Sequence, residues 1–340
     1  MSTFGLDIGT NTIKIAQVEK GSDKKFKLIS AGLIPTPKPG FQSQQDSDLV
    51  GLAQAIKKLH GDAKITTKDV VFSLSEAQIF SRIIEMPPMS EGELIQAVPW
   101  EAEQFVPMPM SEVTLDWQIV SRAEKSKVGE KMKILIIAAP TALIKRYTTV
   151  LEMAGMNVSA IETEMIAAVR ALVSPSSPPT IVVNYGAKSC DIAMVIGGQI
   201  YFTRSISTAG DALTRAISST LALEPSQAEE YKKTYGLEET QLEGKIKKTI
   251  TPVLDIVGAE IKKAILSWKE KDSSQFSGLI LCGGTAGLPQ ISSYLAAQLG
   301  IEVQTADPFS SLTVDPNFIV KLKPNAPLFA VAIGLAEKEV

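Results

Sequence analysis

The stretch Asp7-Ile-Gly-Thr-Asn-Thr-Ile-Lys-Ile-Ala-Gln-Val18 aligns without gaps on Asn184-Tyr-Gly-Ala-Lys-Ser-Cys-Asp-Ile-Ala-Met-Val195. In both copies a glycine stands two residues after an Asp or Asn, and a hydroxyl residue follows three positions after that glycine. An alternating pattern typical of a β-strand comes next in each copy. Two copies of one strand–turn–strand unit therefore predict two related halves, each opening with a β-hairpin.

Each glycine turn has the chemistry of a phosphate site. A tight turn of small residues directs several backbone N–H groups to one spot, and the hydroxyls of Thr10, Thr12 and Ser189 add donors. Asp7 suits an indirect role in which it holds waters on a Mg²⁺ ion. One such turn is most often an ordinary hairpin, but two in corresponding positions favour a triphosphate clamped between two lobes.

A third glycine element follows the predicted strand Leu279–Cys282. It is Gly283-Gly-Thr-Ala-Gly287, and we expect it to open a helix at 288–299. Bare glycines let a flat ligand ring lie against the backbone, and a helix N-terminus favours negative charge. Coming after two phosphate turns, this element predicts the nucleoside side of the same site.

Between these motifs, predicted strands and helices alternate, which is typical of an α/β architecture. Strands are predicted at Phe26–Ile34, Val70–Leu74, Ile181–Val195 and Gln199–Ser205, and helices at Asp48–Leu59, Asp211–Leu223, Pro225–Gly236 and Lys245–Lys269.

Residues 76–155 form a separate predicted module in the first half. Ser90 and Glu93 make a capping box at the start of a predicted helix, Glu91–Phe105. Ile95, Val98 and Ala102 are expected in its core. The module also gathers aromatic and methionine side chains, namely Trp100, Phe105, Trp117, Met86, Met89, Met108 and Met110. Such residues either line a peptide groove or form the module's own core.

Composition excludes several functions. The 340 residues include 34 Lys and Arg against 37 Asp and Glu, for a net charge of −3, so no basic field for nucleic acid is present. One histidine, His60, and two cysteines, Cys190 and Cys282, are too few for a zinc site. No apolar run approaches the roughly 20 residues that span a bilayer, so membrane contact is expected only through a partner.

The three glycine elements, in this order, resemble those of the actin-like ATP-binding superfamily of actin, sugar kinases and seventy-kilodalton heat-shock chaperones. The resemblance implies a two-lobed actin-like α/β fold with duplicated ribonuclease-H-like subdomains, holding ATP and Mg²⁺. Asp7–Lys14 and Asn184–Asp191 correspond to its phosphate motifs, and Cys282–Gly287 to its adenosine motif. Gly155–Arg170 and Ala326–Gly334 look like its two connecting helices.

The same resemblance implies a set of site residues. The implied nucleotide contacts are Gly9, Thr10, Asn11, Thr12, Lys14, Gly186, Ala187, Lys188, Ser189, Gly210, Glu229, Lys232, Gly283, Gly284 and Thr285. Asp7 and Asn184 are the implied indirect Mg²⁺ contacts, and Glu164 and Asp7 are the catalytic candidates. Taken without the resemblance, Glu229 and Lys232 are expected to be a solvated helix pair.

A narrower resemblance is carried by Glu101–Pro109, Glu112-Val113 and Asp116-Trp-Gln118, with Gly210–Thr214 and Ala306–Phe309. These match the PilM family of type IV pilus assembly proteins, which is similar to the division protein FtsA and has an SHS2-type subdomain inserted in its first lobe. The implied domains are 1–75 and 156–178 for the first lobe, 76–155 for the insert, 179–325 for the second lobe and 326–340 for a connecting helix.

Membership of that family implies a cytoplasmic ATP-binding adaptor of the inner-membrane pilus platform, peripheral to the membrane through its partner. The partner is the N-terminal tail of PilN, held in a groove of the insert, and other platform proteins and assembly ATPases are further expected partners. The implied groove residues are Trp100, Glu103, Phe105, Val106 and Pro107.

Departures from the superfamily pattern, which include Ala209 where a second glycine is usual before Gly210, indicate slow hydrolysis at most. Asn184 stands where Asp is usual, which removes a negative charge from the Mg²⁺ site. Lys188 interrupts the small residues of the second turn. Two alternative functions stay open from the sequence: an actin-like filament protein of the MreB type and, with less support, a small-molecule kinase.

Overall fold

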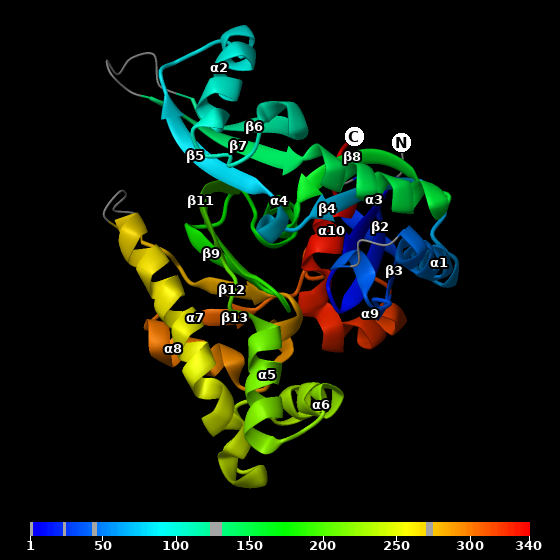
Figure 1. The fold of residues 1–340 in the computed structure, drawn as a ribbon, viewed down its shortest axis with the longest axis vertical. Helices are drawn as coiled ribbons and strands as arrows, with labels where there is room; N and C mark the ends of the chain where they lie inside the picture. Colours follow the sequence, from blue (N-terminus) through cyan, green and yellow to red (C-terminus); the bar gives the residue numbers. More distant parts are fainter. Residues whose placement is uncertain (1–2, 23–24, 43–45, 123–130, 270–274) are drawn as a thin grey trace.

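Two five-stranded sheets carry the two halves of the chain in the structure, a computed structural model (Figure 1). It describes residues 3–340 except 23–24, 43–45, 123–130 and 270–274. The first sheet has the order β3-β2-β1-β4-β8 and the second β11-β10-β9-β12-β13. In each, the first three strands are antiparallel and the last two join in parallel. The predicted duplication is therefore confirmed.

Several of these strands run slightly beyond the ranges predicted from the sequence. The first sheet consists of β1 (Phe4–Ile8), β2 (Thr12–Lys20), β3 (Phe26–Pro35), β4 (Asp69–Leu74) and β8 (Asn157–Thr163). The second consists of β9 (Thr180–Tyr185), β10 (Cys190–Ile196), β11 (Gln199–Ile206), β12 (Leu279–Cys282) and β13 (Val303–Thr305). Strands β8 and β13 were not predicted. Strand β8 lies within the segment expected as a connecting helix, which begins only after it.

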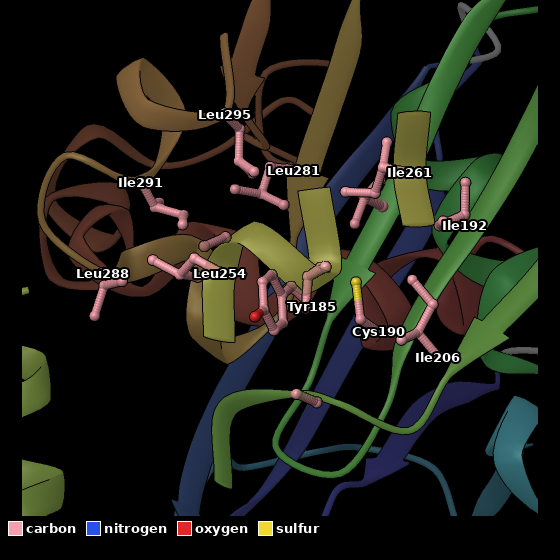
Figure 2. Close-up of a cluster of buried hydrophobic side chains, with 14 of the residues drawn as sticks. Tyr185, Cys190, Ile192, Ile206, Leu254, Ile261, Leu281, Leu288, Ile291 and Leu295 are labelled. Atoms are coloured by element: carbon pink, nitrogen blue, oxygen red, sulfur yellow. The ribbon is translucent and has the colours of Figure 1, made fainter. Parts of the chain in front are cut away.

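Helices cover one face of each sheet. In the first lobe these are α1 (Asp46–Asp62) and α3 (Thr141–Met153), whose apolar side chains share a cluster with β1 and β4. In the second lobe α5 (Gly210–Leu221), α7 (Lys245–Lys269) and α8 (Ile291–Leu299) cover the sheet, and α6 (Pro225–Tyr235) packs on α5 and α7. Figure 2 shows this second core, in which Tyr185, Cys190 and Ile192 lie among leucine and isoleucine side chains.

A shared core joins the lobes. It includes α4 (Glu164–Leu172), α10 (Ala330–Ala336) and buried residues of both sheets. The two helices cross so closely that a Cβ on Gly334 would lie 1.8 Å from the carbonyl oxygen of Ala167. The stretch Pro316–Ala336, made of α9 (Pro316–Leu322), a 3₁₀ segment and α10, is long and apolar enough to cross a membrane by length and composition. All residues of α10 are buried within the protein, as in the core helix of a globular fold.

The inserted module is a three-stranded sheet in the order β5-β7-β6, covered by α2 (Glu91–Glu103). Its strands are β5 (Phe80–Met86), β6 (Val113–Ser121) and β7 (Met132–Pro140). The predicted capping box of Ser90 and Glu93 is present. Helix α3 lies within the predicted module range, but its buried side chains pack in the core of the first lobe.

The expectation that Ile95 belongs to the module core is wrong, because its side chain is 59% exposed. Leu94 takes the inward position instead, and Val98 and Ala102 are buried beside it as expected. A difference of one residue along a helix turns the side chain by about 100°, which decides which of two adjacent apolar residues faces the sheet.

Candidate functional site

A cavity of about 460 Å³ lies between the two lobes. Every nucleotide, metal and catalytic residue expected from the sequence lines it. These residues come from the β1–β2 and β9–β10 turns, the start of α4, helices α5 and α6, and the segment after β12. The duplicated topology thus brings the three glycine elements, which lie far apart along the chain, to a single cavity.

The first turn is held by hydrogen bonds on both sides. The Gly9 amide donates to the Thr12 carbonyl over 3.1 Å, and the Thr36 hydroxyl donates to the Gly9 carbonyl over 2.7 Å. Lys14 Nζ lies 2.7 Å from Asp7 Oδ2, and both side chains are less than a tenth exposed. The turn therefore presents a rigid backbone and one buried ion pair to the cavity.

The second turn is joined directly to the other glycine elements. The Gly186 amide donates to the Ser189 carbonyl over 2.9 Å, which closes the turn. The Gly186 carbonyl accepts from the Gly210 amide at 3.1 Å and from the Thr285 hydroxyl at 3.2 Å. The phosphate-type turn, the start of α5 and the adenosine-type segment consequently form one connected wall.

The third glycine element has a different local structure from the one expected. Gly284–Gly287 is a 3₁₀ turn, and α8 begins only at Ile291, so no helix N-terminus is presented by this segment. Gly283 has a φ of +86°, and a Cβ there would lie 2.6 Å from Asn184 Oδ1. The glycine is required because the backbone both adopts a left-handed conformation and approaches Asn184 closely.

Glu229 and Lys232 are not the solvated pair that their spacing alone suggests. Lys232 is buried, and its Nζ lies 2.6 Å from Glu229 Oε2, 3.1 Å from the Gly210 carbonyl and 2.9 Å from Thr214 Oγ1. Burial alone raises the pKa of Glu229. The hydrogen bonds from Lys232 and Thr214 and the Lys232 charge outweigh it, so the pKa falls below its usual value. The pair ties α6 to α5 at the cavity wall.

Glu164 occupies the first position of α4, where it is half-buried and lines the cavity. Its Oε2 accepts a hydrogen bond from the Asn184 side-chain amide at 3.3 Å, across the two lobes. Burial, followed by the negative charges of Asp7 and Asp191, raises the pKa of Glu164 well above its usual range. Glu162, two residues earlier, instead forms a two-pronged ion pair with Arg170.

Several cavity residues escaped the sequence analysis. The segment before α10 contributes Pro324, Asn325, Pro327 and Leu328, and the Gly283 amide donates to the Pro327 carbonyl over 2.9 Å. The sequence did place a connecting helix at 326–334, but nothing in its apolar pattern indicated a ligand-facing side. Only the position of this segment against Gly283 reveals it.

A second cavity of about 240 Å³ lies where the module meets both lobes. Of the expected groove residues, Phe105 lines it, with the Arg82 guanidinium 5.8 Å from the Phe105 ring centre. Val106 is buried in the module core, whereas Trp100 is 73% exposed, and Glu103 and Pro107 are exposed too.

Glu76 is a buried carboxyl group in the wall of this second cavity. It accepts hydrogen bonds from the Met165 amide at 3.4 Å and from the Ser81 hydroxyl at 3.3 Å. Burial is the largest influence on the group and raises the pKa of Glu76 from 4.5 to about 7. Nothing in the sequence marks Glu76 as a site residue, because one Glu before a strand carries no signal of burial.

We expect Glu76→Gln to change how stability depends on pH. Because its pKa is raised to about 7, Glu76 binds its proton more tightly in the folded chain, so its contribution is largest below about pH 4.5 and is lost as the pH rises through 7. The variant should remove this decline and gain up to about 3 kcal/mol at pH 8. Urea unfolding at pH 5 and pH 8 measures this, with exposed Glu19→Gln as the control. An unchanged pH slope would contradict the assignment.

Comparisons with known proteins agree with this geometry. A family model described as type IV pilus assembly protein PilM matches residues 5–340. A solved PilM-PilN type IV pilus biogenesis complex superposes with a TM-score of 0.86 at 28% identity, covering 99% of this chain and 98% of that chain. FtsA of Bacillus subtilis (strain 168) is 23% identical, covering 92% of this chain and 80% of its own.

One solved relative carries a nucleotide analogue. The structure of MreB 5 of Spiroplasma citri bound to AMPPNP has a TM-score of 0.53 at 13% identity, covering 98% of this chain and 94% of that chain. At that identity the likeness concerns the fold alone. Together with the match to the PilM–PilN structure, it confirms the predicted actin-like α/β fold.

Proposed function

The chain belongs to the PilM family of type IV pilus assembly proteins, and from this membership we propose that it is an ATP-binding adaptor of the inner-membrane pilus platform. In this proposal ATP and Mg²⁺ are held between the lobes, and the cytoplasmic N-terminal tail of PilN docks at the inserted module. The protein then lies in the cytoplasm, peripheral to the inner membrane through PilN, where other platform proteins and assembly ATPases can contact it.

The observation that carries the nucleotide part is the convergence of three glycine elements on one cavity. The two hairpin turns would hold the phosphates, with Lys14 and Lys188 as cations, and the backbone at Gly283 and Gly284 would lie against the nucleoside. The donor set also fits Mg²⁺, because Asp7 and Asn184 are oxygen-bearing side chains suited to holding its waters. The ion would neutralise phosphate charge.

The surroundings of Glu164 support slow hydrolysis at most. Burial raises the pKa of Glu164, so its carboxyl group keeps its own proton to higher pH, and in that protonated form it cannot accept a proton from an attacking water. The Asn184 amide donates a hydrogen bond to Glu164 across the lobes, at the position where the superfamily has an Asp. We therefore infer that ATP serves mainly to fix the relative position of the lobes.

The PilN part is supported by the solved PilM-PilN complex, which this chain resembles over its whole length. The second cavity supplies a recess at the module, with Phe105 and Arg82 in its wall. Trp100, Glu103 and Pro107 are exposed on the same module. We propose that Phe105 contacts the part of the tail inside the cavity, and that these exposed residues contact the part outside it.

Binding of a PilN tail peptide, measured by isothermal titration calorimetry, tests the docking proposal. Phe105→Ala should weaken peptide binding at least tenfold, because a well-packed aromatic side chain in a recess contributes most of the binding energy. Trp100→Ala should weaken it by a smaller factor, because its side chain is 73% exposed. The control is Ile256→Ala, an apolar residue on α7 in the other lobe that is 54% exposed. Unchanged affinity in Phe105→Ala would refute the docking site.

A further inference from the structure

Two residues that border the second cavity, Asp191 and Met165, adjoin residues that border the nucleotide cavity. The second cavity is bordered by Phe80 and Arg82 of the module, Met165 of the first lobe, and Asp191 and Ser205 of the second lobe. Because the module and both lobes contribute, a group that occupies this cavity contacts both of the lobes whose relative position the nucleotide would fix.

Asp191 is the most direct link between the two cavities. Its side chain is 1% exposed, and Oδ2 accepts a 2.7 Å hydrogen bond from the Ser189 hydroxyl, which lines the nucleotide cavity. The other oxygen, Oδ1, is buried and makes no hydrogen bond of ordinary geometry in the described part of the chain. Burial raises the pKa of Asp191, and the side chains of Ser205 and Ser189 lower it in part. An unsatisfied buried carboxylate oxygen is costly, and it is satisfied when a donor group reaches it.

Glu76 forms a second link beside the first. It accepts from the Met165 amide, and Met165 directly follows Glu164, which lines the nucleotide cavity. The first link joins the two cavity walls directly, by the hydrogen bond between Ser189 and Asp191. The second link lies within the wall of the second cavity and reaches the nucleotide cavity only through the chain, because Met165 follows Glu164.

The arginines that border the second cavity have other partners. Arg204 pairs with Glu260 of α7, and the Arg82 guanidinium lies over the Phe105 ring. Neither appears among the hydrogen bonds or ion pairs of Asp191 and Glu76 in the described residues. The buried acids thus offer a place for a charged donor from outside.

We propose that a positively charged donor group of the docked tail enters this cavity, hydrogen-bonds Asp191 Oδ1 and thereby tightens nucleotide binding. The inference rests on the proposed function and adds a coupling residue to it. A negative charge on Asp191 lies behind the Ser189 turn, where it repels phosphate. It also holds the Ser189 hydroxyl in a hydrogen bond, so that this hydroxyl is not free to donate to phosphate. A donor on Oδ1 weakens both effects. By linkage, nucleotide tightens tail binding by the same factor.

The test measures the affinity of a fluorescent ATP analogue with and without a saturating PilN tail peptide. In the unaltered protein the peptide should tighten the nucleotide at least fivefold. In Asp191→Asn this factor should fall below twofold, while nucleotide affinity without peptide stays equal or rises, because a repelling charge is gone. General structural damage would instead lower the affinity for the nucleotide. Ser189→Ala should also lose the coupling.

Two controls complete the test. Glu337→Gln alters another buried carboxyl group that borders neither cavity, and it should keep the full coupling. A tail peptide with its positive groups blocked should lose the tightening. If either ligand fails to bind the unaltered protein, the proposed function fails and the inference falls with it. If both ligands bind the unaltered protein without coupling, the inference alone is overturned. The same conclusion follows if the coupling persists in Asp191→Asn or with the blocked peptide.

Discussion

Replacing Lys14 by Met should lower the free energy of unfolding by about 3–5 kcal/mol, because it leaves the Asp7 carboxylate buried without its partner. The two side chains are 8% and 7% exposed and lie 2.7 Å apart, so little solvent compensates the loss. The same change removes a cation from the first turn and should weaken ATP binding at least tenfold. Chemical unfolding and nucleotide titration measure the two effects.

A double variant separates these effects. Asp7→Asn with Lys14→Met removes both charges and should recover most of the lost stability, but not the ATP affinity. Lys20→Met is the control, because Lys20 pairs with Glu339 on the surface and such pairs contribute less than about 1 kcal/mol. Full stability in the single Lys14→Met variant would show that Asp7 is satisfied in another way.

Gly334→Ala should destabilise the protein by about 2–3 kcal/mol, although alanine favours helix formation over glycine. A Cβ at this position would lie 1.8 Å from the Ala167 carbonyl oxygen, which is backbone and cannot turn aside. The helices α4 and α10 would have to separate, and both belong to the core shared by the lobes. Thermal unfolding followed by circular dichroism measures the change.

Gly51→Ala in α1 is the matched control for that substitution. A Cβ there meets no atom within 4 Å, so only helix propensity acts and stability should rise by up to about 1 kcal/mol. Opposite signs for two glycine-to-alanine changes inside helices would establish close packing at α4 and α10 as the cause. The same sign for both would refute it.

The site is a case in which local sequence was unusually informative. The residues of the two hairpin turns and of Gly283–Thr285 line the predicted cavity because their geometry is set by short-range backbone preferences, which a local pattern encodes. The local pattern does not predict the 3₁₀ turn at 284–287. Pro289 is compatible with a helix start, whereas Gly283 is held by contacts with Asn184 and Pro327, which lie far away along the chain and leave no local signal.

The sequence by itself determined the duplication, and it predicted a separate module in the first half and the residues of the two hairpin turns, because repeats, caps and glycine turns are properties of neighbouring residues. Only the tertiary structure decided which polar groups are buried and paired. Lys232, Glu76 and Asp191 look like ordinary charged residues in the chain. Each becomes buried through partners on other elements, as when Glu76 meets Met165 across 89 positions. Burial of charge is a property of that packing, and it is what links the second cavity to the first.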